Sequence, residues 1–451
     1  MTATIDPAKT ANIPEVGKAR PVKLPTVADT TLRSGLRIIA ARKPGVPRVE
    51  ARLVIPTARR GDAGKSAVLN LLAKTLLSGT STRDDVQIAE ELQTIGGSLD
   101  ANADEEDIAL TGSALAPALP RLLDLMAEVL VDAAHPDDEV ALQGARLQQE
   151  ITLARSQPEM IAREALLRRL FGRHPYGRGL PTPEEVARVK PAIVRSAQLE
   201  RLLPAGSILT IVGDIKPDRA VAAAEEALSG WKGGSTKDVG LPAPGPFKPG
   251  ATVLVAREGA VQTNIRLGGR AVTRTHPDWP ALALANLVLG GYFVSRLVDN
   301  IREKRGYTYS PGSAVRHERQ ASYFWLQADV GTEVTGPALV EIRYELERML
   351  AGPITDAELL SAKRYLSGTL AMSIQTQSGL ATYLAILAIA GLPLEYLRDY
   401  PKQVEALGEQ EVIDAARQYL APWRLSTVLV GDADAVRATA DAFGPVEATT
   451  V

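Results

Sequence analysis

Hydrophobic and polar positions follow two different periods in the first part of the chain. Runs rich in apolar and β-branched residues predict strands at Leu32–Ala40 and Val49–Ile55. Apolar residues on nearly every face then predict a buried helix over Ser66–Leu77, which a serine and a glycine end. A more amphipathic helix is expected over Asp84–Leu92.

A second pair of strands and a run of helices continue the same unit. The strands are predicted at Gly96–Ala101 and Asp107–Ser113, and the helices at Ala116–Leu130, Asp137–Arg155 and Pro158–Phe171. A run of strands followed by a run of helices is typical of an α+β unit.

The second half of the chain repeats signals of the first half. Val212–Asp214 recurs 218 positions later as Val430–Asp432, and five further positions around it keep that offset. Leu77–Gly79 likewise matches Leu289–Gly291, with an apolar helical stretch before each. Since chance tripeptides would not keep one register this far, we interpret the chain as two divergent copies of one unit.

The repeat and a change in composition predict the domain boundaries. Gly233–Gly250 is dense in glycine and proline and has no periodicity, which predicts a linker. We therefore predict an N-terminal extension over 1–30, a first domain over 31–232, the linker over 233–250 and a second domain over 251–451.

Charge and residue usage exclude several chemistries. The 51 Lys and Arg against 53 Asp and Glu give a net charge of -2, which provides no field to attract nucleic acid. The absence of cysteine excludes disulfides, thiolate nucleophiles and Cys-ligated metals. Only four histidines are present, and none has a second histidine nearby on a helix.

Two segments bear on localisation. The first 25 residues have no apolar stretch of the kind found in signal peptides, so we expect a loosely attached arm and a cytoplasmic protein. The most apolar stretch, Gly379–Leu394, is shorter than the roughly 20 residues that a membrane-spanning helix needs. We therefore expect a buried helix there and no membrane span.

Several segments, each weak alone, occur in an order and spacing that resemble the pitrilysin or insulinase family of zinc metallopeptidases, which includes mitochondrial processing peptidase. They are Ser66–Thr80, Ile95–Ala101, His174–Gly177, Leu209–Asp214, Asn286–Gly291, Ser295–Leu297 and Arg302–Ser310. The resemblance implies an α+β fold with two tandem homologous domains, each a mostly antiparallel sheet packed with helices.

Active members of this family carry the zinc motif H-x-x-E-H on the first long helix. Alignment on the residues after that helix places Asn70, Ala73 and Lys74 at its three chemical positions. Asparagine is a poor zinc ligand, alanine cannot accept a proton, and lysine puts a cation where the dication would sit. No slip of the alignment restores the motif, because the four histidines nowhere form it or its inverse. We therefore predict no metal in this chain.

A third zinc ligand of the family would fall on Glu150. A lone carboxylate does not define a zinc site, so a solvated or salt-bridged helix glutamate is the favoured interpretation.

The resemblance also assigns a second half of the active site to the C-terminal domain. Arg302 and Tyr309 match an arginine and a tyrosine that bind substrate and stabilise the tetrahedral intermediate in the family. The alternative is that Arg302 pairs at a helix end and Tyr309 begins a strand. The α subunit of mitochondrial processing peptidase, also inactive, has an extended glycine-rich loop where this chain has the short Gly290–Phe293.

The glycine pair before the predicted strand at Ser98 is a candidate for substrate binding. Gly97, Ser98 and Leu99 match the edge to which a substrate strand adds in the family. A glycine-assisted tight turn into a paired strand explains the same residues equally well.

The leading hypothesis is a non-catalytic subunit of a heterodimeric zinc metallopeptidase, because in heterodimeric bacterial members one subunit carries the zinc motif and the other carries the Arg/Tyr pair. The expected partners are a homologous zinc-bearing subunit and a peptide or unfolded polypeptide, and the zinc would belong to the partner. Two alternatives stay open: a structural scaffold, comparable to inactive core subunits of respiratory complexes, and a stand-alone peptide-binding protein.

Overall fold

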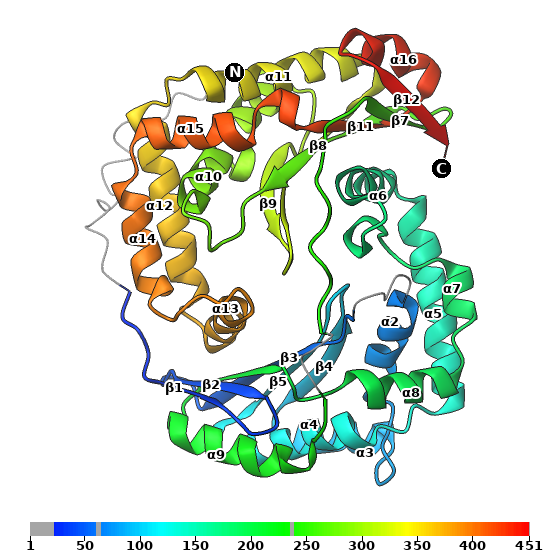
Figure 1. The fold of residues 1–451 in the computed structure, drawn as a ribbon, viewed down its shortest axis with the longest axis vertical. Coiled ribbons are helices and arrows are strands. Elements are labelled where there is room, and N and C mark those ends of the chain that lie inside the picture. Colours follow the sequence, from blue (N-terminus) through cyan, green and yellow to red (C-terminus); the bar gives the residue numbers. More distant parts are fainter. Residues whose placement is uncertain (1–21, 60–64, 235–238, 451) are drawn as a thin grey trace, which may run out of the picture.

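A computed structural model describes residues 22–59, 65–234 and 239–450, and these form two α+β units, each built on one six-stranded sheet (Figure 1). The strands of the first unit are β1 (Val27–Thr31), β2 (Arg37–Arg42), β3 (Arg48–Pro56), β4 (Ser98–Ala103), β5 (Asp107–Leu115) and β6 (Ile208–Gly213). Those of the second are β7 (Thr252–Ala256), β8 (Gln262–Ala271), β9 (Gly312–His317), β10 (Ser322–Gly331), β11 (Ser426–Gly431) and β12 (Val446–Thr450).

The two sheets have the same topology apart from one edge strand. Their orders are β1-β2-β6-β3-β5-β4 and β12-β7-β11-β8-β10-β9. In each sheet the second and third strands are parallel, and the three pairs that follow are antiparallel. The predicted α+β fold of two homologous units with mostly antiparallel sheets is confirmed.

The second unit also repeats the order of helices along the chain. Those of the first unit are α2 (Ser66–Thr75), α3 (Asp85–Thr94), α4 (Leu119–Asp132), α5 (Asp137–Ser156), α6 (Pro158–Phe171), α7 (Pro183–Ala187), α8 (Pro191–Arg201) and α9 (Pro217–Ala227). Those of the second are α10 (Trp279–Asn286), α11 (Thr335–Ala351), α12 (Asp356–Ser373), α13 (Gln377–Ile389), α14 (Tyr396–Ala406), α15 (Glu409–Tyr419) and α16 (Ala433–Ala442).

The single strand predicted at Leu32–Ala40 is wrong. β1 and β2 form an antiparallel hairpin instead, and the chain turns between them, where the Leu32 N–H donates to the Leu36 carbonyl at 2.8 Å. Gly35 lies in this turn with φ +85°, a conformation that a residue with a Cβ atom adopts only with strain. The first strand therefore begins at Val27, inside the range assigned to the N-terminal extension.

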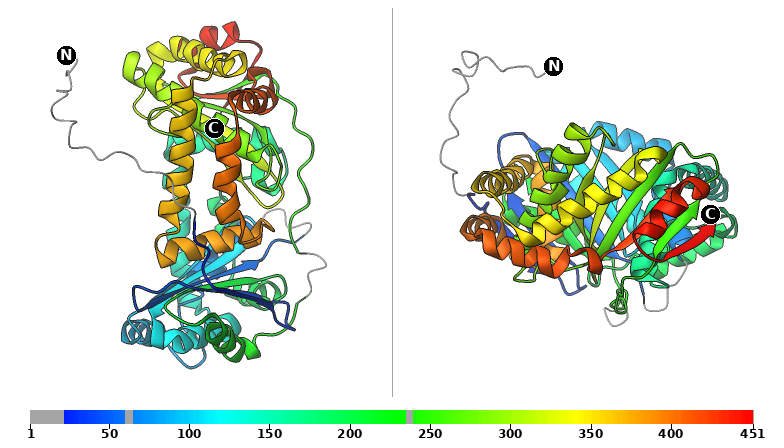
Figure 2. Two further views of the ribbon diagram at one scale, coloured as in Figure 1. Left: turned by 90° about the vertical axis from the view of Figure 1, so that its left-hand side faces the viewer. Right: turned by 90° about the horizontal axis from the view of Figure 1, so that it is seen from above.

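Each unit sends one helix onto the sheet of the other. α5 and α12 run between the two units on opposite sides of the molecule, and α6 and α13 follow them (Figures 1 and 2). α6 packs on β8 and β11, whereas α13 packs on β3 and β6. Across the second contact, the Thr210 hydroxyl donates to the Ala381 carbonyl at 3.2 Å. Each sheet is therefore covered in part by a helix of the other unit, so the two units depend on each other for their cores.

The tips of two equivalent hairpins also meet between the units. Arg319, after β9, donates from Nε and Nη2 to the two carboxylate oxygens of Asp107 at 3.0 and 2.7 Å. Its backbone N–H donates to Glu106, and the next N–H, of Gln320, donates to the Tyr176 hydroxyl at 3.1 Å. Burial raises the pKa of Asp107 to about 6 although Arg319 opposes that shift.

The apolar stretch predicted as a buried helix is α13. Leu380, Ala381 and Leu384 are buried on it, and they pack against the first sheet. Within the part of the chain that the structure describes, no helix is both long and apolar enough to cross a membrane.

Candidate functional site

The positions of the family's zinc motif lie on α2. This helix packs against β4, α5 and α8, and its buried face includes Leu71 and Leu72. Asn70 is half-buried and its side-chain amide donates to the Ser66 carbonyl at 2.9 Å, so the amide is used within the helix. Ala73 is buried. Neither side chain presents an atom that binds zinc well or takes up a proton.

Lys74 and Glu150 meet across α2 and α5. The Lys74 Nζ donates to both oxygens of the Glu150 carboxylate, at 3.0 and 3.3 Å. The two positions that the family uses for ligands are therefore adjacent in space here, although 76 residues separate them. The salt-bridged interpretation of Glu150 therefore describes the geometry, in which the ammonium group of Lys74 occupies the space beside this carboxylate.

The described residues near α2 supply no substitute metal site. Among the described residues, no group of three or more His, Asp or Glu side chains is arranged to hold a metal ion. His135 is fully buried beside the end of α2, with its Nδ1 at 2.7 Å from the Thr75 hydroxyl. Burial lowers its pKa to about 4, so the imidazole is neutral and serves the packing between α2 and the segment before α5.

The candidate substrate edge is the terminal strand of the first sheet. A Cβ atom on Gly97 would lie 2.3 Å from the Ser113 carbonyl oxygen, and Gly96 has φ +59°, so the glycine pair makes a tight turn. Ser98 and Leu99 begin β4, which pairs with β5 on one side only within the described sheet. The two interpretations of these residues, a tight turn and an unpaired strand edge, therefore both describe the structure.

Arg302 and Tyr309 come together in the second unit. Arg302 lies in η5 (Val298–Lys304), a π-helical segment of a kind that occurs often at functional sites. Its guanidinium carbon lies 4.8 Å from the ring centroid of Tyr309 and 4.8 Å from that of Phe293, so two aromatic rings flank it. Its Nε also lies 3.3 Å from the neighbouring Glu303 carboxylate.

An open groove of about 380 Å³ contains this pair. Tyr309 and Phe293 are 80% and 64% exposed, and no ion pair other than that with Glu303 is present for Arg302 among the described residues. Trp325 and Gln327 line the groove from β10. Its guanidinium and phenol can donate hydrogen bonds to the carbonyl oxygens of an extended peptide.

Hydrogen bonds on the buried side of η5 fix the backbone that carries Arg302. Asn300, on the buried side of η5, donates from its amide to Glu345 and Glu341 of α11 at 2.7 and 2.9 Å. Gly306, with φ +65°, turns the chain toward Tyr309, and its N–H donates to the Arg302 carbonyl at 3.0 Å. The arginine is therefore positioned by buried polar contacts while its head stays accessible.

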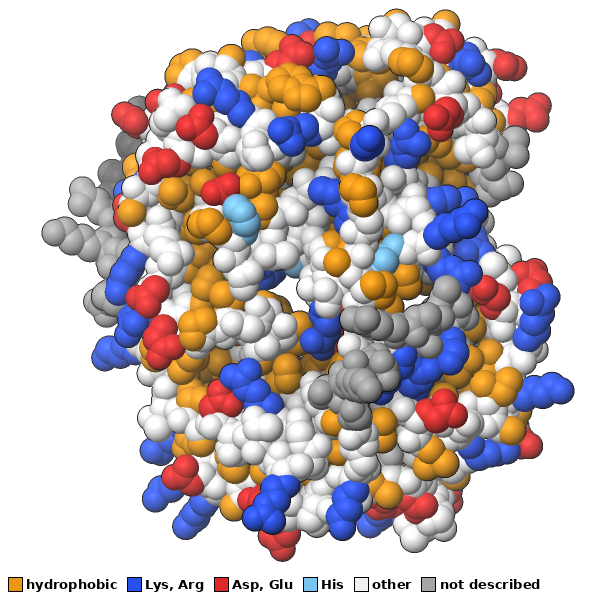
Figure 3. Space-filling model, viewed as in Figure 1, with side chains coloured by type: hydrophobic (Ala, Val, Ile, Leu, Met, Phe, Trp, Pro, Cys, Tyr) orange, Lys and Arg blue, Asp and Glu red, His pale blue; other side chains and the backbone are white. Residues whose placement is uncertain are grey.

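Reasoning from the sequence missed the contribution of Phe293. This residue belongs to the short Gly290–Phe293 segment, which was noted only for its length. The available signal was a pair of aromatic residues, Tyr292 and Phe293, directly after a glycine pair. The two candidate halves lie in different units, and Figure 3 shows a hollow near the centre of the face between those units.

Comparisons with known proteins agree with this fold. The family model of Insulinase (Peptidase family M16) matches residues 37–184, and that of the Peptidase M16 inactive domain matches residues 194–366. An uncharacterised zinc protease of Mycobacterium tuberculosis is 27% identical over 397 residues, which cover 87% of this chain and 90% of that protein. One of Bacillus subtilis is 23% identical over 348 residues, covering 77% and 84%.

Two solved structures share the architecture. A peptidase M16 inactive domain from Pseudomonas fluorescens superposes with a TM-score of 0.83 at 23% identity, covering 90% of this chain and 98% of that one. A protease from Helicobacter pylori gives the same TM-score at 20% identity, covering 91% and 100%. At these identities the likeness establishes the fold, and function has to be argued from the site.

Proposed function

The chain belongs to the M16 peptidase family, and we propose that within it the chain acts as a non-catalytic subunit. In this proposal it pairs with a homologous subunit that carries the zinc motif. It supplies Arg302 and Tyr309 to a peptide or unfolded polypeptide bound at the partner's site. Hydrolysis itself is assigned to the partner.

The observation that carries the proposal is the contrast between the two half-sites. On α2, Lys74 already binds Glu150, so the family's metal positions are occupied by an ion pair. In the second unit Arg302 and Tyr309 remain accessible in a groove. A scaffold without any role in catalysis has no need to support an exposed arginine with buried polar contacts.

The chemistry of the second unit suits a peptide substrate. A guanidinium offers a rigid set of donors to a carbonyl or carboxylate, and a phenol can donate to an oxygen on which negative charge develops. The rings of Phe293 and Tyr309 flank the guanidinium, which limits the rotamers of Arg302 before substrate arrives. An arginine restricted in this way loses less entropy on binding.

The test is reconstitution with a homologous subunit that contains H-x-x-E-H. Hydrolysis of an unstructured fluorogenic peptide is measured for each subunit alone and for the mixture, with activity expected only when the zinc-bearing subunit is present and highest in the mixture. Arg302→Ala and Tyr309→Phe are expected to lower kcat/KM of the mixture about 100-fold or more, the scale for loss of one oxyanion donor. Arg437→Ala, on exposed α16, is the matched control and should leave the rate unchanged.

Two results would overturn the proposal. Unchanged activity of the mixture with Arg302→Ala and Tyr309→Ala would favour the scaffold alternative. Stoichiometric zinc in the pure chain, together with cleavage that a chelator stops, would contradict the assignment of chemistry to the partner.

A further inference from the structure

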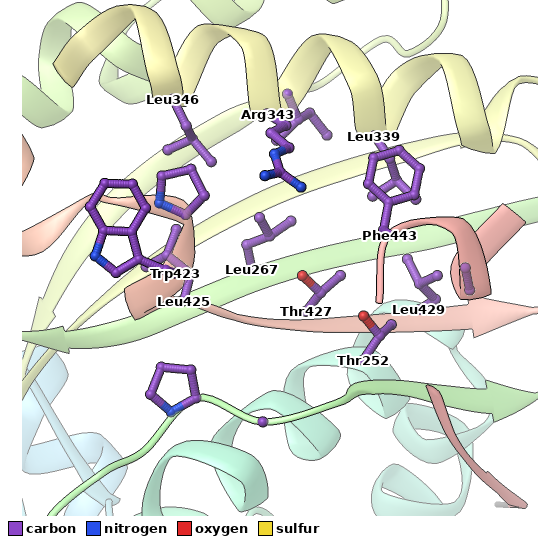
Figure 4. Close-up of a pocket in the computed structure, with 15 residues that line it drawn as sticks. Thr252, Leu267, Leu339, Arg343, Leu346, Trp423, Leu425, Thr427, Leu429 and Phe443 are labelled. Carbon is purple, nitrogen blue, oxygen red and sulfur yellow. The ribbon is translucent and has the colours of Figure 1, made fainter. Parts of the chain in front are cut away.

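A pocket of about 320 Å³ lies on the outer side of the second sheet, between the sheet and α11, and it shares no lining residue with the groove of Arg302 and Tyr309 (Figure 4). Leu339, Arg343 and Leu346 point into it from α11, and Leu267 of β8 lies beneath them. Trp423 and Phe443 lie at its two ends. The pocket is mainly apolar and opens to solvent.

The first unit has the same frame, and there its own chain packs against the helix that corresponds to α11. α4 corresponds to α11 with an offset of 216, so Leu123 matches Leu339 and Leu130 matches Leu346, and all four are buried. Leu53 matches Leu267 by its strand pairing. In this unit the turn η3 (Leu228–Gly230), directly after α9, packs against both α4 and α9.

The residue that completes the filling is a tryptophan. Trp231 follows η3, is 3% exposed, and belongs to the same buried cluster as α4 and the first sheet. Its indole N–H donates to the Leu202 carbonyl, at the end of α8, at 2.8 Å. The first unit therefore shows how this fold buries an indole ring beside the helices α4 and α9.

Among the residues that the structure describes, the second unit has no segment equivalent to η3 and Trp231. After α16, Gly444 adopts φ +138° and the chain turns away into β12, which pairs with β7. Two positions on the sheet beneath the pocket also carry smaller or more polar side chains than in the first unit. Thr252 and Thr427 stand where the first unit has Ile38 and Leu209. The two changes together leave the pocket.

We propose that this pocket binds a tryptophan side chain presented by a polypeptide segment of a partner protein. The indole would lie between Leu346 and Phe443, with the Arg343 guanidinium positioned to contact its face. A buried tryptophan supplies a large apolar area together with one polar donor, which is the chemistry that the first unit uses at this place.

The surroundings of the pocket favour a protein over a free small molecule. Trp423 is 69% exposed at the rim. An exposed aromatic side chain at the rim extends the contact beyond a single inserted ring, and exposed apolar surface of this kind is typical of protein interaction sites. The template in the first unit is likewise a short turn of polypeptide.

The proposal is tested with a fluorescein-labelled octapeptide that copies residues 226–233, EALSGWKG, and with the full-length chain. Fluorescence polarisation should show saturable binding, and the same peptide with alanine in place of the tryptophan should bind at least tenfold more weakly. Ala440→Phe fills the pocket from α16 and should weaken binding at least tenfold. Ala438→Phe, exposed on the same helix, is the matched control and should leave it unchanged.

A second variant keeps the proposal testable if the Ala440→Phe protein fails to fold. Trp423→Ala changes only an exposed rim residue and should weaken binding about threefold or more while the circular dichroism spectrum stays the same. Equal binding of the tryptophan and alanine peptides would overturn the proposal. A dimer of the chain that both Ala440→Phe and Trp423→Ala disrupt would also overturn it, because it would assign the pocket to a second copy.

Discussion

The two units share one frame of strands and helices and differ in what they leave accessible. In the first unit, Lys74 and Glu150 bind each other, and Trp231 closes the outer face of the sheet. In the second, Arg302 and Tyr309 stay accessible in a groove, and a pocket of about 320 Å³ opens between α11 and the sheet. In the first unit these side chains therefore make internal contacts, whereas in the second unit they stay accessible.

In a duplicated fold, one unit can use its side chains for internal contacts while the other leaves the matching surfaces accessible. The helix exchange gives each sheet a cover from the other unit, since α6 packs on the second sheet and α13 on the first. Surfaces of the second unit can therefore stay incomplete without loss of the core. The comparison can be tested by variants that remove a contact from one unit and leave the matching position of the other untouched.

The largest effect is expected for Trp231→Ala. Removal of a buried tryptophan leaves a cavity and the Leu202 carbonyl without its donor, so the free energy of unfolding should fall by about 3–5 kcal/mol. Denaturation in urea, followed by far-UV circular dichroism, measures the change. Trp423→Ala in the second unit is the control, and because Trp423 is exposed its effect should stay within about 0.5 kcal/mol. Similar losses for both variants would refute the contrast between the outer faces.

A smaller and pH-dependent effect is expected where the two units meet. Glu318 lies beside Arg319 at the tip of the β9–β10 hairpin, and burial, with the charges of Glu105, Glu106 and Asp104, raises its pKa to about 7. Arg163 opposes this shift. A carboxyl group whose folded pKa exceeds the unfolded value of about 4.3 stabilises the fold fully below that value. That stability is lost as the pH rises through about 7.

Glu318→Gln removes this titration. The variant should be more stable than the parent at pH 8 by about 1–2 kcal/mol, less than the full shift in pKa would give because part of the side chain meets solvent. The two proteins should converge as the pH falls toward 4. Urea unfolding between pH 4 and pH 8 gives the comparison, and Glu159→Gln, at an exposed position of α6, is the control. A parent protein that gains stability relative to the variant as the pH rises would contradict the assignment.

Much of the frame could be predicted from the sequence because it depends on local periodicity and on repetition. The recurrence of Val212–Asp214 as Val430–Asp432 marks β6 and β11, which occupy the same place in their two sheets. The exchange of α6 and α13 could not be predicted, since an apolar helix face does not specify which sheet covers it. The hairpin in place of one strand at Leu32–Ala40 was missed because apolar residues flank its turn on both sides.

The residues of the candidate site could be named from the sequence, but their geometry could not. Arg302, Tyr309 and the altered motif positions were named because of the resemblance to the family's motifs. The 3.0 Å contact of Lys74 with Glu150 joins two helices and depends on their packing. The position of Phe293 over the guanidinium depends on the turn after Gly291, which no periodic pattern specifies.

The smallest effect is expected for Lys74→Met, and it addresses what the Lys74–Glu150 ion pair contributes to the first unit. The lysine and glutamate side chains are 31% and 57% exposed, so their ion pair is screened by water and should contribute less than about 1 kcal/mol to the free energy of unfolding. A double-mutant cycle with Glu150→Gln, in 50 mM and 500 mM salt, measures the coupling between the two residues. Its value should be small and should shrink with salt. A coupling above about 2 kcal/mol would mean that the cation has become part of the core support of α2 and α5. A small coupling would mean that α2 keeps its place through Leu71 and Leu72, so that the side chain at position 74 can change without loss of the fold.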